Sequence, residues 1–145
     1  MDEKIIIQPK GMAEAVGPFS RAILIGNYLH ISGTTALSHI KGDYYERKMP
    51  PTIEEQTRLT LDNIQKCVVA AGGTMDDVIK VVVMLKNQSE YKRMNAVRAE
   101  YFKESPPIST CFIADLANDD VLVEIEAVAY IKNPVIKRSE EHTSE

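Results

Sequence analysis

A strict alternation of residue types predicts a strand at residues 121–131. One set of alternate positions is wholly apolar: Val121, Val123, Ile125, Ala127, Ala129 and Ile131. This period of two indicates that one face of the strand lies in a core. The other face carries Glu124 and Glu126 among apolar neighbours, which fits neither a uniformly solvated face nor a fully buried one. We therefore expect this face to meet either a water-filled cleft or another subunit.

Short apolar and β-branched runs predict five more strands, at residues 4–8, 22–25, 28–32, 78–85 and 109–113. Gly26-Asn27 suits a tight hairpin between the second and third of them. Pro106-Pro107 excludes a helix just before the last, because proline requires extended backbone in the residue ahead of it. If strands 109–113 and 121–131 lie near each other, Ser109 or Cys111 could face Glu124.

Two segments have the apolar spacing of helices. The first begins at Thr52, which can form a capping box with Glu55, and it ends at Gly72-Gly73. Its core-facing stripe comprises Leu61, Ile64, Val68 and Ala71. The second is capped by Ser89 and ends before Ser105, with Met94, Val97 and Tyr101 on its apolar side.

This order of elements predicts one α+β domain over residues 1–137. Helices that connect strands suggest at least one β-α-β crossover, and the hairpin adds antiparallel pairing, so we expect a mixed sheet with both helices on one face. The other face would then lack a cover within the chain, which favours oligomerisation. The loop at residues 34–51 contains Tyr44 and Tyr45, which could cover a pocket, pack on a neighbouring subunit or simply be solvated.

Composition narrows the classes of function. The chain has 145 residues, of which 44% are apolar and 26% charged, and its net charge is −4. An acidic chain without a Lys/Arg cluster argues against a nucleic-acid surface. No apolar run is long enough to span a membrane, and MDEK is too acidic to begin a signal peptide, so we expect no membrane partner and a cytoplasmic location.

The cysteines and histidines suggest no metal site. Cys67 and Cys111 lie in a predicted helix and a predicted strand, form no metal-binding spacing, and are expected to be reduced and to pack as small apolar groups. No histidine near Cys111 in sequence could activate it as a nucleophile. Residues 138–145, RSEEHTSE, match the translation of a sequencing-adapter oligonucleotide, so we expect a disordered non-native tail.

Several blocks of the chain, in order, resemble the Rid family, also called the YjgF/YER057c/UK114 family. The likeness covers nearly all of residues 4–132, and the middle portion also resembles the aminoacrylate deaminase branch. The blocks are Gly17-Pro18-Phe19-Ser20, Ile31-Ser32-Gly33, Gln56-Thr57-Arg58 with Leu61-Asp62-Asn63-Ile64, residues 71–78, Met94-Asn95 with Tyr101-Phe102, and residues 123–127.

The resemblance implies a chorismate-mutase-like fold assembled as a homotrimer, with a central barrel and ligand clefts between subunits. It also implies cofactor-free hydrolysis of imines and enamines, such as 2-aminoacrylate, to a keto acid and ammonia. Matched by position, Glu124 orients the attacking water, Phe19 walls the cleft, and backbone groups near Gly33 and Cys111 polarise the imine. Thr110, next to Cys111, is expected to bind substrate with them.

Ser109 departs from this pattern, because it stands where the family has an arginine that holds the substrate carboxylate. A serine cannot neutralise a carboxylate, and the loss of a charged two-pronged hydrogen bond weakens anion binding by about 2–5 kcal/mol. Arg21, just after Ser20, is a candidate substitute cation.

Two hypotheses of different classes follow. The first is a hydrolase or deaminase of small imines, enamines or related C–N compounds that lack the usual carboxylate, with Ser109 in the binding site and Glu124 as general base or water positioner. The second is a protein that binds a small molecule or partner in the same cleft without turnover. A third activity claimed for relatives, ribonuclease, gains nothing from an acidic chain.

Overall fold

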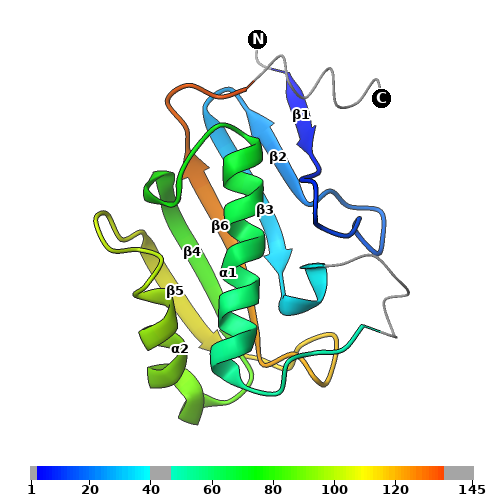
Figure 1. The fold of residues 1–145 in the computed structure, drawn as a ribbon, viewed down its shortest axis with the longest axis vertical. Coiled ribbons are helices and arrows are strands. Elements are labelled where there is room, and N and C mark those ends of the chain that lie inside the picture. The colour runs from blue at the N-terminus through cyan, green and yellow to red at the C-terminus, as the bar shows by residue number, and fades with distance from the viewer. Residues whose placement is uncertain (1–2, 40–46, 136–145) are drawn as a thin grey trace.

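The computed structural model describes residues 3–39 and 47–135 as six strands and two α-helices with short 3-10 helices between them (Figure 1). The strands are β1 (Lys4–Ile7), β2 (Ala22–Ile25), β3 (Tyr28–Thr34), β4 (Val78–Leu85), β5 (Ile108–Ile113) and β6 (Val123–Tyr130). The helices are α1 (Ile53–Ala70) and α2 (Tyr91–Arg98), and the 3-10 turns are η1 (Ala36–His39), η3 (Met75–Asp77) and η4 (Gln88–Glu90).

All six strands form one mixed sheet in the order β1-β2-β3-β6-β4-β5. Strand β6 lies antiparallel between β3 and β4, whereas β5 pairs parallel with β4 at the edge. The parallel pair β4–β5 is joined through α2, which is the predicted β-α-β crossover. Gly26, with φ of 58°, makes the predicted turn between β2 and β3.

Helix α1 lies across one face of the sheet and closes the core (Figure 1). Its predicted stripe is confirmed, since Leu61, Ile64, Val68 and Ala71 are all fully buried. The Thr52 hydroxyl accepts a hydrogen bond from the Glu55 N–H at 3.2 Å, so the threonine half of the capping box is present. Gly72, at φ 100°, ends the helix as predicted, because only glycine adopts that conformation without strain.

Helix α2 is shorter than predicted. It starts at Tyr91 after the turn η4, so Ser89 is not its cap, and it ends at Arg98 rather than just before Ser105. Met94 and Val97 are buried as expected, whereas Tyr101 lies in the turn that follows the helix. The early end matters for function, because it places Arg98 at the last turn of α2, close to β5.

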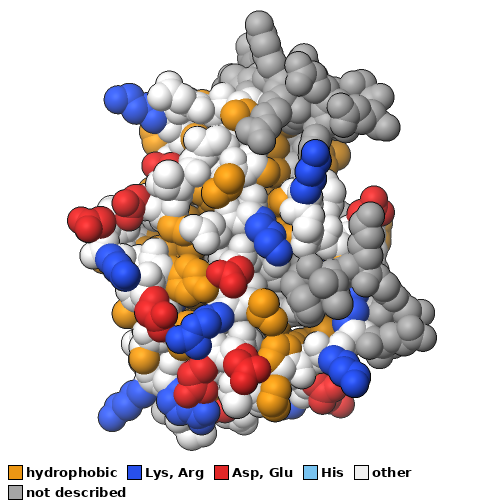
Figure 2. Space-filling view, viewed as in Figure 1, with side chains coloured by type: hydrophobic (Ala, Val, Ile, Leu, Met, Phe, Trp, Pro, Cys, Tyr) orange, Lys and Arg blue, Asp and Glu red, His pale blue; other side chains and the backbone are white. Residues whose placement is uncertain are grey.

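The two faces of the sheet differ in character. Figure 2 shows the helix side of the molecule, where acidic and basic side chains are interspersed. The other face, which we call the open face, has no cover among the described residues and exposes apolar side chains from five strands, including Ile6, Ile25, Tyr28, Phe112 and Tyr130. Tyr28 and Tyr130 pack edge to face there with ring centroids 5.2 Å apart. The predicted bare sheet face is therefore present.

Two predictions lie outside the described residues. They concern the loop residues Tyr44 and Tyr45 and the tail at 138–145. Within the described ranges, no helix has the length and apolarity needed to cross a membrane.

Candidate functional site

The carboxylate of Glu124 lies directly against Gly33. Residues Ser32 and Gly33 together stand opposite Glu126, because the register between β3 and β6 shifts between Ile31 and Thr34 and forms a β-bulge. A Cβ atom added at Gly33 would fall well inside van der Waals contact of Glu124 Oε2 and 3.1 Å from Cδ. The bare backbone of Gly33 therefore provides the space that the Glu124 carboxylate occupies.

Glu124 is a half-buried carboxylate that has no cationic partner within residues 3–39 and 47–135. Among the described residues, none forms an ion pair or side-chain hydrogen bond with it. Burial, and secondly the negative charge of Glu126 on the same face, raise the pKa of Glu124 above that of an ordinary glutamate. A carboxylate whose pKa is raised in this way is a better proton acceptor than an ordinary glutamate.

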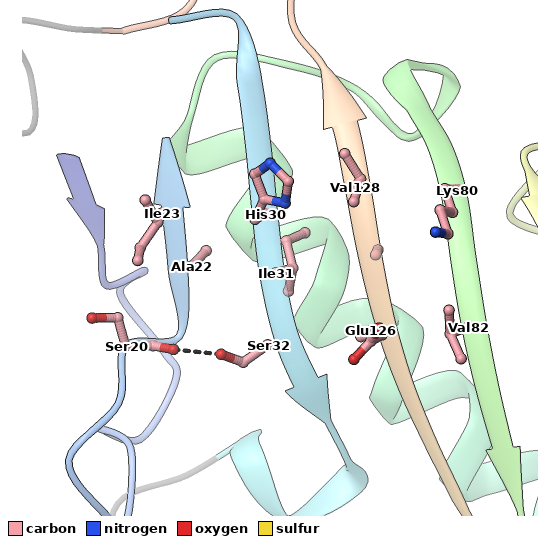
Figure 3. Close-up of a pocket in the computed structure, with 11 residues that line it drawn as sticks. Ser20, Ala22, Ile23, His30, Ile31, Ser32, Lys80, Val82, Glu126 and Val128 are labelled. Atoms are coloured by element: carbon pink, nitrogen blue, oxygen red, sulfur yellow. Dashed lines mark hydrogen bonds between the residues drawn. The ribbon is translucent and has the colours of Figure 1, made fainter. Parts of the chain in front are cut away.

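Next to this carboxylate, the open face is hollowed. A depression of about 290 Å³ lies over β2, β3, β6 and β4 (Figure 3). Figure 3 looks onto the open face and shows His30, Lys80 and Glu126 as the titratable side chains around it, with Val128 between His30 and Lys80 and Val82 beside Glu126. The face predicted to combine carboxylates with apolar side chains thus carries Lys80, Glu126 and His30 around apolar residues.

The Gly17–Ser20 segment is tied to the same end of β3. Ser32 Oγ donates a hydrogen bond of 2.6 Å to the Ser20 carbonyl (Figure 3). The Ser32 N–H donates to the Arg21 carbonyl at 2.9 Å. Phe19 is half-exposed, with 49% of its surface accessible, and it lies one residue from that attachment. The structure therefore brings the Phe19 segment close to Gly33 and Glu124.

Arg21 does not serve as the substitute cation. It is buried, with Nε donating to the Ala13 carbonyl at 2.8 Å and Nη2 donating to the Glu14 carbonyl at 3.0 Å. These bonds fix the connection between β1 and β2, so the role of Arg21 is structural.

The β5 residues lie apart from Glu124 within one chain. Strand β4 separates β5 from β6, and Ser109 and Cys111 pair with the buried residues Val81 and Val83 on the helix side of the sheet. Glu124 instead projects from the open face, as does Thr110. The prediction that Ser109 or Cys111 could face Glu124 is therefore wrong for a single chain, because sequence proximity did not reveal the strand between them.

A cation does stand beside Ser109. Arg98 Nη1 donates a hydrogen bond of 2.7 Å to Ser109 Oγ, and Arg98 Nε donates one of 2.7 Å to Asn95 Oδ1. The expectation that this position lacks a cation, and with it the argument for an uncarboxylated substrate, is contradicted by this contact. Sequence reasoning missed Arg98 because the helix was predicted to end just before Ser105. Arg98 was therefore not recognised as a residue of the last turn of α2, beside β5.

The cysteines are free thiols in weakly reactive surroundings. Cys67 is fully buried beside Met12, and burial raises the pKa of its thiol to about 12. Cys111 is half-buried against the core, and burial raises its pKa although the nearby Arg98 acts in the opposite direction. Neither thiol is therefore poised as a nucleophile. Across residues 3–39 and 47–135, no three His, Cys, Asp or Glu side chains are grouped to hold a metal ion.

Comparison with known proteins identifies the family of this chain. Residues 10–131 match the model of the family described as Endoribonuclease L-PSP, and the matching relatives include Rid and YjgF proteins. The chain belongs to the Rid/YjgF family. A RutC family protein of Pyrococcus horikoshii is 39% identical over 127 residues, which cover 88% of this chain and 98% of that protein.

Solved Rid structures share the fold. One from Yersinia pestis, described as a Rid protein of unknown function, is 29% identical with a TM-score of 0.79 and covers 89% of this chain and 100% of its own. E. coli TdcF with bound serine is 28% identical with a TM-score of 0.77, covering 86% of this chain and 97% of its own. The Rid resemblance and the α+β fold with two helices are thus confirmed.

Proposed function

We propose that this Rid protein hydrolyses small imines or enamines to a carbonyl compound and ammonia, with Glu124 as the group that positions and deprotonates water. The observation that carries the proposal is the Glu124 carboxylate itself, which is half-buried against Gly33, unpaired among the described residues, and raised in pKa. A structural glutamate in that setting would normally have a cationic partner.

The reaction requires little beyond a placed base. An enamine first becomes an imine by gaining a proton on its β-carbon and losing one from its nitrogen. The oxygen of a water molecule then bonds to the carbon of the C=N group, the second C–N bond breaks, the Glu124 carboxylate accepts a proton from the water, and the nitrogen gains one. The resulting carbinolamine then breaks its C–N bond, ammonia leaves, and the hydroxyl becomes a carbonyl. A general base of this kind contributes about 10²- to 10⁴-fold in rate.

The cleft would be built from two copies of the chain. Within one chain, Ser109 and Cys111 lie on the helix side of the sheet edge, whereas Glu124, Gly33 and the Phe19 segment lie toward the open face. The exposed apolar open face supplies a surface for association, because apolar patches of this kind are usually buried by a partner. We propose a cyclic homotrimer in which the β5 edge of one subunit, with Ser109, Thr110 and Cys111, meets the Glu124 region of the next.

Relatives support a small ligand rather than a nucleic acid. TdcF is described with bound serine, a molecule of the size of the proposed substrates. The name endoribonuclease attached to other relatives gains no support here, since the chain is acidic, with a net charge of −4. We also place the reaction in the cytoplasm, where short-lived imines would be released.

An ammonia-release assay tests the proposal. The wild-type protein and Glu124→Gln are supplied with imines generated in situ, some with a carboxylate and some without. We expect ammonia release by the wild type above the spontaneous rate, and a loss of about 10²-fold or more in Glu124→Gln. Absence of turnover on every imine, together with saturable binding of a small ligand, would instead establish the non-catalytic binding protein.

A further inference from the structure

A second hollow, of about 460 Å³, lies between α2 and β5 and has a marked asymmetry of charge. It is lined by Lys92, Asn95, Ala96, Arg98, Ala99, Phe102, Pro106, Pro107 and Ser109. The lining includes two cations and no carboxylate, and the remaining walls are mostly small or apolar side chains. We propose that this hollow is a binding site for a small carboxylate, with Arg98 as the residue that holds it.

The guanidinium of Arg98 is fixed in place without being neutralised. Its Nε and Nη1 donate to the neutral oxygens of Asn95 and Ser109, each at 2.7 Å. Throughout the part of the chain that the structure describes, no ion pair involves Arg98. By contrast, Arg58 of α1 and Arg93 of α2 are paired with Glu100 and Glu54, respectively.

The geometry leaves donors for an anion. A guanidinium has five N–H groups, and the two bonds to Asn95 and Ser109 leave the outer Nη2 group and one N–H of Nη1 for a two-pronged bond to a carboxylate. Ser109 accepts from Arg98, so its own hydroxyl hydrogen is left to donate to the same ligand. Serine and arginine together thus form an anion site that neither residue forms alone.

The walls define the rest of the ligand. Ala96 and Ala99 contribute only small side chains to the lining, and Phe102, Pro106 and Pro107 contribute carbon surface. A carboxylate on a short carbon body suits such a site, and the exposed residue Lys92 in the lining adds long-range attraction. The inference rests on the proposed function only in naming this carboxylate as part of the substrate; the anion site itself stands on the α2–β5 geometry.

Calorimetric titration with pyruvate, compared with the neutral pyruvamide of similar size, tests the site without requiring turnover. We expect the wild type to bind pyruvate and not pyruvamide, and Arg98→Met to weaken pyruvate binding about 10- to 100-fold. Arg98→Lys should recover only part of the affinity, because lysine lacks the planar fork. Arg93→Met, which removes the same charge from the same helix outside the hollow, should bind as the wild type does.

The outcomes separate this inference from the proposed function. Glu124→Gln should lose turnover and retain pyruvate binding, because Glu124 is the proposed base and does not line the hollow that would hold the carboxylate. If Arg98→Met binds pyruvate as tightly as the wild type, or if pyruvamide binds equally well, the carboxylate site is wrong whatever the ammonia assay gives. If binding depends on Arg98 but no imine is turned over, the site is upheld and the hydrolase is wrong.

Discussion

The carboxylate of Glu124 occupies the space that a side chain at Gly33 would fill. The β-bulge at Ser32 and Gly33 places the bare glycine against β6, where the register shift leaves two residues of β3 opposite Glu126. The contact explains why a glycine stands at this strand end, although its backbone is not in the left-handed region. The Glu124 side chain can therefore adopt this conformation only because residue 33 has no side chain.

Gly33→Ala should therefore impair activity more than stability. The methyl group meets the far end of a flexible side chain, so we expect Glu124 to swing away while the fold persists, with a change in unfolding free energy of under about 1 kcal/mol. Turnover should fall at least about tenfold, since a small misplacement of a catalytic group is costly. Steady-state kinetics and urea denaturation measure the two effects.

The double variant Gly33→Ala/Glu124→Gln is the control for this mechanism. If the alanine acts by displacing Glu124, it should have little further effect once Glu124 is already glutamine. Independent, multiplying losses in the double variant would show that Gly33 acts through some other contact.

The acid limb of the pH–rate profile should report Glu124. The base must be ionised, and burial and Glu126 raise its pKa, so activity should decline on acidification at a pH above the ordinary glutamate range. Glu126→Gln removes the repulsive charge and should move this limb to lower pH. A limb that stays in place in Glu126→Gln would contradict the proposed electrostatic coupling.

The ionisation of Glu124 that the reaction requires should also lower the stability of the folded protein. Because folding raises the pKa of Glu124, the folded state binds the proton more tightly than the unfolded chain, and ionisation disfavours the folded state. Glu124→Gln should therefore have a higher urea midpoint than the wild type at pH 7. The difference should vanish at about pH 3, where both states of the wild type are protonated. Equal midpoints at pH 7 would indicate that Glu124 has a partner in the assembled protein.

Gln56 should be the most costly polar residue of α1 to replace. Its buried side chain donates to the carbonyls of Pro50 and Asp120 at 2.8 and 3.0 Å and accepts from the Leu122 N–H at 2.8 Å. Gln56→Leu leaves these three backbone groups unpaired, so we expect a loss of about 2–3 kcal/mol in unfolding free energy. Gln65→Leu, the same change at an exposed position of the same helix, should stay within about 0.5 kcal/mol.

Periodicity predicted the elements because their patterns were complete within short windows. The alternation of residues 121–131 and the stripe of Leu61, Ile64 and Val68 depend only on local spacing, and both are borne out by burial. The spatial separation of Ser109 from Glu124 could not be predicted from local spacing. It depends on β4 entering the sheet between β5 and β6, which is a property of long-range pairing.

Arg98 illustrates a second limit of sequence reasoning. Position-by-position matching finds a serine at 109 and therefore predicts that the site lacks a positive charge. A residue elsewhere in the sequence can still place its charge at the same site, as Arg98 of α2 does. The bond from Arg98 to Ser109 depends on where α2 ends, and helix ends are the least certain part of a periodicity argument. A function inferred from a single changed residue therefore needs the packing around that residue.

Complementation between two inactive variants tests the central claim most directly. Glu124→Gln removes the base, and Ser109→Tyr fills the hollow on β5 without changing a charge; each is expected to be inactive alone. Co-expressed with different affinity tags and purified through both, mixed trimers should each hold one intact site, which gives about one third of the wild-type rate of ammonia release. Mixed assemblies as inactive as either parent would contradict a site shared between the Glu124 face of one subunit and the β5 edge of its neighbour.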